Sequence, residues 1–146
     1  MDEEYDKLKD KVDYKDSVFR AFFGRSPGYY ERTWEGVWYQ FKGDIDLEKL
    51  EAVINEVGAE RIPFVRIEMG TNLIGGQPVS LQNVEDVSSI CKKYNIPLMI
   101  DASLITDNLY FNKVREEKCK DMTIHQIALA ISNCADIIYF SARKLG

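Results

Sequence analysis

Apolar residues along this chain recur at two kinds of spacing, which predict alternating helices and strands. Three segments have apolar residues at helical spacing, and each follows a residue suited to an N-cap: Asp46, Ser80 or Thr123. The predicted buried helix faces are Leu47, Leu50, Ile54 and Val57; Val84, Val87, Cys91 and Tyr94; and Ile124, Ile127, Ala128 and Ile131. Thr123 and Gln126 also have the spacing of a capping box. A further helix is expected from about Asp107 to Lys118.

Short apolar runs lie between these helices and predict strands at residues 37–41, 63–68, 97–100 and 137–140. The runs are continuous rather than alternating, which is typical of strands covered on both faces. We therefore expect an α/β fold with a mostly parallel sheet, right-handed crossovers and a buried final strand.

The first 40 residues differ in character from the rest of the chain. Charge clusters alternate there with aromatic residues, and Tyr5, Leu8 and Val12 favour an N-terminal helix that ends before residues 24–28. We interpret the aromatic residues as core or docking surface. The predicted division is an aromatic-rich segment at 1–40 and a domain at 41–146.

Size, composition and charge narrow the class of protein. With 146 residues, 45% of them hydrophobic, the chain is long enough to bury one core. A net charge of −5 argues against nucleic acid as a partner, and no apolar run reaches the length of a membrane span. The acidic N-terminus does not resemble a secretory signal. Three widely spaced cysteines favour a reducing, cytoplasmic setting and match no zinc pattern, so no metal site is expected.

Five candidate site residues follow the predicted strands. Asn72 follows the second strand, Asp101 ends the third, and Ser141, Arg143 and Lys144 follow the fourth. Parallel strands end at one edge of a sheet, so these side chains are expected to converge. A lysine amine and an aspartate are what a pyridoxal phosphate site needs, for a Schiff base and for the ring nitrogen. Without GxGxxG or Walker A sequences, the common nucleotide sites are not indicated.

Each candidate also has an ordinary structural interpretation. Lys144 could be a solvated surface group, Asp101 could cap the next segment, and Asn72 could be a turn residue. The same layout also suits α/β domains that bind other ligands.

From residue 41 onward the sequence resembles the pyridoxal-phosphate-dependent β-eliminating lyases, the family of tryptophanase and tyrosine phenol-lyase. The matching stretches are residues 41–47, 71–72, 75–80, 101–103, 108 with 110–111, and 141–144. The run Gly75-Gly76-Gln77-Pro78-Val79-Ser80 is the most specific of them. Residues 91–97 and 120–124 look closer to tryptophanase.

The resemblance implies a fold, a cofactor and roles for individual residues. The fold would be a partial three-layer, mostly parallel sheet like the large domain of fold-type I enzymes. Lys144 would form the Schiff base with pyridoxal phosphate, and Asp101 would contact its pyridine nitrogen. Asn72 would lie near the ring 3-hydroxyl, Ser141 would contact the phosphate, and Arg143 would keep a positive charge beside the cofactor.

The sequence also departs from the family. Leu104 stands where the family has an arginine, and Leu145 stands where it has an aspartate. The resemblance covers only the central part of a large domain, without the small domain or the family's potassium ligands. The expected function is that of a tryptophanase-like lyase, as a fragment or degenerate member that is inactive by itself. The alternatives are a non-catalytic α/β interaction module or one half of a split enzyme, and in either case we expect self-association or a partner chain.

Overall fold

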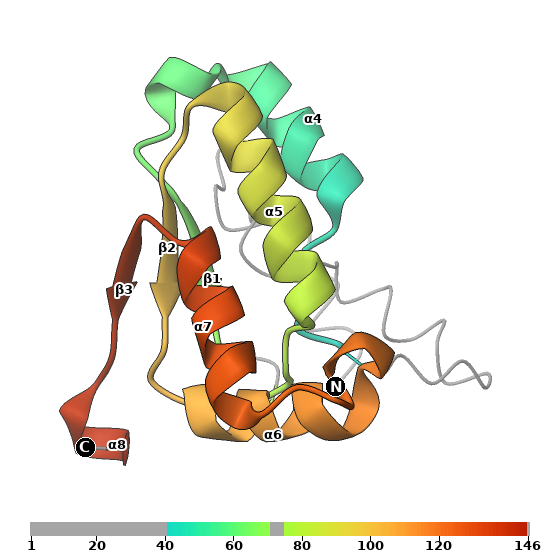
Figure 1. Cartoon of the computed structure of the whole chain (residues 1–146). Helices are drawn as coiled ribbons and strands as arrows, with labels where there is room; N and C mark the ends of the chain where they lie inside the picture. Colours follow the sequence, from blue (N-terminus) through green and yellow to red (C-terminus); the bar gives the residue numbers. More distant parts are fainter. Residues whose placement is uncertain (1–40, 71–74, 146) are drawn as a thin grey trace, which may run out of the picture.

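A computed structural model describes residues 41–70 and 75–145, with the backbone alone at 144 and 145 (Figure 1). The helices are α4 (Leu47–Val57), α5 (Leu81–Tyr94), α6 (Ile105–Arg115), α7 (Ile124–Cys134) and the short α8 (Ala142–Leu145). The strands are β1 (Val65–Glu68), β2 (Leu98–Asp101) and β3 (Ile137–Tyr139). Two 3₁₀ turns, Ala59–Arg61 and Glu117–Cys119, follow α4 and α6. The chain thus alternates helices and strands, and the predicted α/β class is confirmed.

The three described strands form one parallel sheet in the order β1-β2-β3. Glu68 of β1 lies opposite Asp101, and Asp101 in turn lies opposite Tyr139 of β3. Because the strands run in the same direction, their carboxyl ends meet at one edge, as predicted from the sequence.

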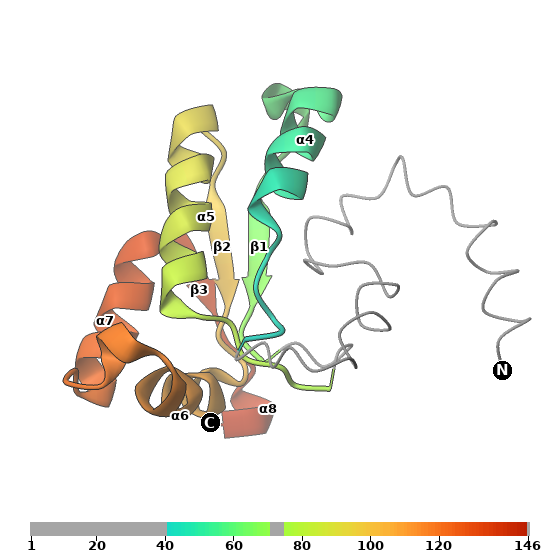
Figure 2. The same cartoon turned by 90° about the vertical axis from the view of Figure 1, so that its right-hand side faces the viewer.

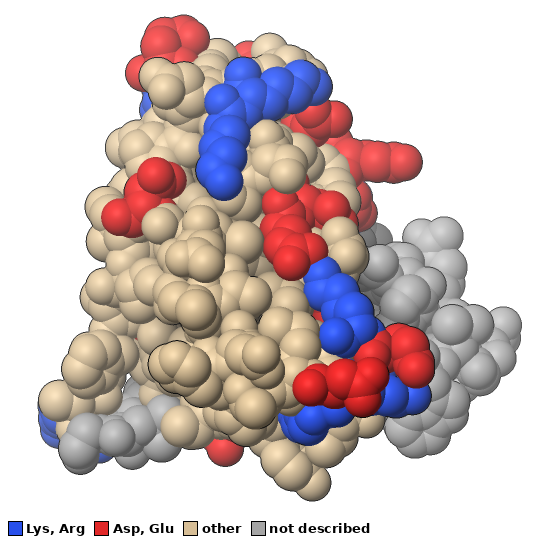
Figure 3. Space-filling model, viewed as in Figure 1, with Lys and Arg blue, Asp and Glu red and all other residues tan. Residues whose placement is uncertain are grey.

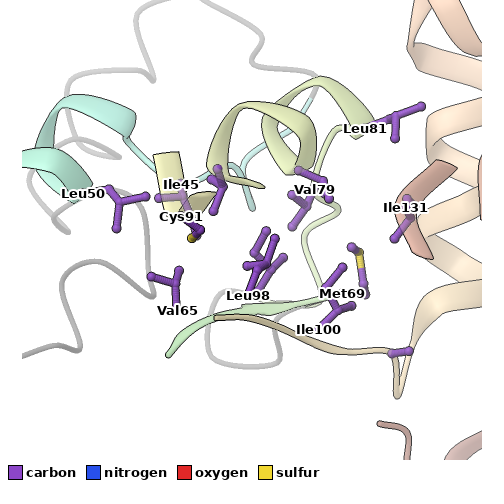
Figure 4. Close-up of a cluster of buried hydrophobic side chains, with 14 of the residues drawn as sticks. Ile45, Leu50, Val65, Met69, Val79, Leu81, Cys91, Leu98, Ile100 and Ile131 are labelled. Atoms are coloured by element: carbon purple, nitrogen blue, oxygen red, sulfur yellow. The ribbon is translucent and has the colours of Figure 1, made fainter. Parts of the chain in front are cut away.

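Helices α5 and α7 lie together on one face of this sheet, and α6 runs across the carboxyl ends of the strands (Figures 1 and 2). The core lies between the sheet and these helices (Figure 4). Inward positions of β1 and β2 such as Ile67 and Ile100 are fully buried, whereas their neighbours Arg66 and Met99 are only half-buried. Burial therefore alternates along the two strands, and the expected burial of both faces is not met within the described residues.

Local capping signals set the starts of the main helices, as predicted. Asp46 accepts the N–H of Lys49, and Ser80 accepts the N–H of Asn83. Thr123 forms a reciprocal capping box with Gln126. In each cap a side chain accepts a backbone N–H three residues later, which is why sequence alone locates the caps.

The strand predicted at residues 137–140 is confirmed, but the prediction that it is buried is wrong. Strand β3 forms over residues 137–139, but it pairs only with β2 among the described strands. Its residues are exposed, and Phe140, just after it, is 66% exposed. Ile124, predicted to face inward, is also exposed, since it is the first residue of α7. The expected helix at 1–40 and most of the strand at 37–41 lie outside the described residues.

Candidate functional site at the carboxyl edge of the sheet

Asp101 lies at the carboxyl edge of the sheet, and both of its carboxylate oxygens accept hydrogen bonds. It is the last residue of β2, and the chain turns sharply after it toward α6. Its Oδ1 accepts hydrogen bonds from the backbone N–H of Ser103 at 3.0 Å and from the Ser103 hydroxyl at 2.5 Å. An aspartate that bonds the backbone two residues later forms an Asx turn, so the local sequence itself fixes this oxygen.

The second oxygen of Asp101 is held from the neighbouring strand. The Tyr139 hydroxyl donates to Oδ2 at 2.9 Å, and that hydroxyl accepts a bond from Nη1 of Arg66 at 3.3 Å. Arg66 also lies 3.5 Å from the carboxylate of Glu68. Strand register explains this arrangement, because side chains of opposite residues in a parallel sheet share a face.

These contacts determine the direction in which the pKa of Asp101 is shifted. Its partial burial by itself would raise the pKa of the carboxyl group. The hydrogen bonds from Ser103 and Tyr139 and the charge of Arg66 outweigh burial and lower that pKa below its ordinary value. Asp101 is therefore a fixed anion at neutral pH. The Tyr139 phenol shows the reverse effect: burial and the hydrogen bond to Asp101 raise its pKa, so it remains a donor.

Ser103 connects Asp101 to a second predicted site residue. The backbone N–H of Ser141 donates to the Ser103 hydroxyl oxygen at 3.1 Å, and the same hydroxyl donates to Asp101. Ser103 is buried, so water competes little for these bonds. The structure thus brings Asp101 and Ser141 together through one hydroxyl group.

The structure describes the other predicted site residues only in part. The backbone of Lys144 lies in α8, which begins directly after Ser141. Arg143 is exposed on the same helix. Asn72 lies outside the described residues. Leu104, at the position of the expected arginine, packs on the neighbouring strand end, where a Cβ at Gly70 would come within 2.9 Å of its Cβ.

The segment at residues 77–82 is held in place by distant side chains. Asp44 accepts from both the N–H and the hydroxyl of Ser80, at 2.7 and 3.1 Å. Asn108 forms a reciprocal pair of bonds with the backbone of Val79, and Asn112 donates to the same carbonyl. The N–H of Gly43 donates to the carbonyl of Pro78. Much of the specific Gly75–Ser80 run is therefore fixed as a structural link between the start of the domain and α6.

Glu116 completes this network from beyond α6. Its carboxylate is buried and accepts the N–H groups of Leu81 and Gln82, each at 2.8 Å, and an N–H of Asn112 at 3.0 Å. The N-terminus of α5 is thus capped by a distant acid as well as by Ser80.

Sequence reasoning missed Ser103, Tyr139, Arg66 and Glu116 as supporting residues. Ser103 could have been found, because an aspartate two residues before a serine after a strand is a recognisable Asx-turn pattern. The contacts of Tyr139 and Glu116 depend on strand register and helix packing, over separations of 38 and 35 residues, and carried no local signal.

Among the described residues no group of three histidines, cysteines or acids is placed to hold a metal ion. No helix in the same part of the chain is long and apolar enough to cross a membrane.

The arrangement and the sequence together define the class of protein. The family model for β-eliminating lyases matches residues 10–146, and the chain belongs to that family. The match begins upstream of residue 41, the first residue of the predicted domain, and the division at residue 40 stays a prediction.

Among individual proteins, the chain is similar to tryptophanases. It is 46% identical over 109 residues to tryptophanase of Escherichia coli O9:H4 (strain HS). The same identity is found to tryptophanases of Shigella boydii serotype 18 and Escherichia coli O157:H7. The aligned part is 75% of this chain but 23% of each relative, so the chain spans about a quarter of the length of these relatives.

Proposed function

We propose that this chain carries the cofactor-holding part of a pyridoxal-phosphate-dependent β-eliminating lyase. The observation that carries the proposal is the Asp101 carboxylate, kept anionic by three hydrogen bonds at the carboxyl end of a parallel strand. A fixed anion at this place suits a protonated ring nitrogen. Family membership and the similarity to tryptophanases support the same cofactor.

The residues present fit pyridoxal phosphate in their chemistry. Asp101 would hold the proton on the ring nitrogen, and Lys144 would form the covalent link through its amine. Asn72, Ser141 and Arg143 would contact the ring hydroxyl and the phosphate side. When bound, the cofactor supplies an electron sink for the bond that breaks at the substrate's α-carbon. Once displaced by substrate, the Lys144 amine would take up the α-proton as general base.

For the substrate we propose L-tryptophan, on the 46% identity to tryptophanases. The reaction consumes one water and gives indole, pyruvate and ammonia. One proton leaves the α-carbon, the bond between the β-carbon and indole C3 breaks, and indole C3 gains a proton. No net oxidation occurs.

The three cysteines, which are free, support a reducing cytoplasmic setting.

Absorbance and covalent trapping test the cofactor proposal. The full chain mixed with pyridoxal phosphate should gain a visible absorbance band, and borohydride should fix the cofactor on the peptide that contains Lys144. Lys144→Ala should abolish both signals, while Lys92→Ala, which changes an exposed lysine of α5, should keep them. The absence of a band, or its retention in Lys144→Ala, would refute cofactor binding by this lysine. Indole release from tryptophan then tests turnover separately.

A second candidate function is a module that acts only when docked on another chain. The observation that favours it is the exposed apolar surface of β3 and α7, where Ile137, Leu129 and Phe140 are 46%, 52% and 66% exposed. Uncharged side chains cover the middle of the face over α7 (Figure 3). Such a surface on an edge strand favours association. A band without indole release, followed by release when a second chain is added, would select the split-enzyme form of this candidate.

A further inference from the structure

The contact between Tyr139 and Asp101 joins the edge strand to the proposed cofactor site. Tyr139 is one of the three residues of β3, and its register places it opposite Asp101 on the same face of the sheet. Its hydroxyl is 2.9 Å from Oδ2, while both Ser103 bonds go to Oδ1. The two carboxylate oxygens are therefore held from two different strands.

We propose that Tyr139 is a positioning residue, which fixes the plane of the Asp101 carboxylate so that it can receive the protonated nitrogen of the cofactor ring. This inference rests on the proposed function. A carboxylate has about four acceptor positions, and the three protein donors leave room for one more. The two Ser103 bonds hold Oδ1, and the Tyr139 bond holds Oδ2 from the neighbouring strand. Because both oxygens are held, the plane of the carboxylate is fixed more firmly than by the Ser103 bonds alone.

Arg66 sets the direction of the Tyr139 hydroxyl. Its Nη1 donates to the phenol oxygen at 3.3 Å, so the phenol proton is left to point toward Asp101. Among the described side chains, the charged groups near the carboxylate are Arg66 and Glu68 of β1, and the neutral phenol of Tyr139 lies between Arg66 and Asp101. The order of donation runs from guanidinium to phenol to carboxylate, and each group is satisfied by the next.

The decisive variant is Tyr139→Phe, which removes only the hydroxyl. Its matched control is Tyr94→Phe at the end of α5, whose hydroxyl lies 3.5 Å from the Glu51 carboxylate of α4 and which precedes the start of β2, whereas Asp101 is at the end of that strand. Arg66→Gln is a second variant that leaves the Tyr139 ring intact. The first measurement is the pKa of the Asp101 carboxyl group in the chain without cofactor, followed by NMR through the chemical shift of its carboxyl carbon. The second is the affinity for pyridoxal phosphate by absorbance titration.

We expect Tyr139→Phe to raise the Asp101 pKa and to weaken cofactor binding about 3- to 10-fold, the usual effect of one hydrogen bond. Arg66→Gln should change both quantities in the same direction, and Tyr94→Phe should change neither. An unchanged Asp101 pKa in Tyr139→Phe would overturn the inference, as would a raised pKa with unchanged cofactor affinity. If the unaltered chain bound no cofactor, the proposed function would fail and this role with it. The NMR measurement would still report whether Tyr139 contacts Asp101, so the two failures are distinguishable.

Discussion

The Glu116 carboxylate accepts the backbone N–H of Leu81 at 2.8 Å, although 35 residues separate them. Glu116 lies just after α6 and Leu81 begins α5, so an acid from one helix caps the start of another. A helix N-terminus has unpaired N–H groups and a partial positive charge, and a buried carboxylate satisfies both. This contact explains why an acidic residue can be buried here.

Replacing Glu116 should therefore destabilise the fold strongly. Glu116→Ala leaves two backbone N–H groups and one Asn112 N–H without their acceptor, and we expect a loss of about 3 kcal/mol in the free energy of unfolding. Urea denaturation measures it. The neighbouring Glu117, which is exposed, provides the control, and Glu117→Ala should change stability by less than about 0.5 kcal/mol. Equal effects of the two substitutions would contradict the capping role.

Gly43 should not accept a side chain. A Cβ built there would lie 2.7 Å from the carbonyl oxygen of Pro78 and 2.8 Å from that of Gln77, both backbone atoms that cannot move aside cheaply. We expect Gly43→Ala to cost about 1–3 kcal/mol and to loosen the segment at residues 77–82. Gly76 serves for comparison, because a Cβ there meets nothing within 4 Å and asparagine tolerates its positive φ. Thermal melts in which Gly76→Asn is as destabilised as Gly43→Ala would count against this account.

Asp101 should contribute stability that disappears in acid. Its pKa is lowered in the folded chain, so its contribution is complete above the unfolded value of about 4 and declines as the pH falls through the lowered pKa. Unfolding free energies from pH 2 to 7 should differ between the unaltered chain and Asp101→Asn by an amount that shrinks below about pH 4. Asp107→Asn, on the exposed side of α6, should follow the unaltered chain. A gap that is constant over the whole range would show that the carboxylate charge is not involved.

The thiols should react unequally. Burial, together with smaller contributions from the charges of Asp136 and Glu116 respectively, raises the pKa of Cys91 and of Cys119 to about 11. Cys134 also has a raised pKa, chiefly from burial, but it is partly exposed. We expect a thiol reagent at pH 8 to modify Cys134 first in the native chain and all three cysteines after denaturation.

The same pKa shifts predict a loss of stability in alkali. A thiol whose folded pKa is raised favours the folded state below its unfolded value of about 8.5. That contribution falls as the pH rises through about 11.

In the experiment with the thiol reagent, Cys134→Ser should lack the fast phase of labelling. Three equal rates in the native chain would disagree with the burial of Cys91 and Cys119.

The exposed end of β3 should drive self-association. Phe140 is 66% exposed next to an edge strand, so Phe140→Ser should lower the apparent mass in light scattering at high concentration without lowering the melting temperature. Leu129→Ser on α7 tests whether the association surface extends over that helix. An unaltered chain that stays monomeric at about 1 mM would remove the basis of this prediction.

Features encoded within a few residues were predictable from the sequence, and features encoded by packing were not. The caps at Asp46, Ser80 and Thr123 and the strand ending at Asp101 follow from local spacing. The burial of β3 was predicted wrongly, because an apolar run indicates a strand but does not say whether a neighbour covers it. The lowered pKa of Asp101 depends in part on Tyr139 and Arg66, which are brought near it by strand register.

The difference between local contacts and contacts between distant residues also affects the order in which the fold can form. Residues 78–82 have acceptors and donors at Gly43 and Asp44 before them and at Asn108, Asn112 and Glu116 after them. During synthesis from the N-terminus, α5 can form a helix as soon as it emerges. Its first turn receives all of its hydrogen-bond partners only after α6 has been made. Residues 43–116 should therefore become cooperative in a single late step, and the start of α5 should gain its hydrogen-exchange protection together with α6 rather than with the rest of its own helix.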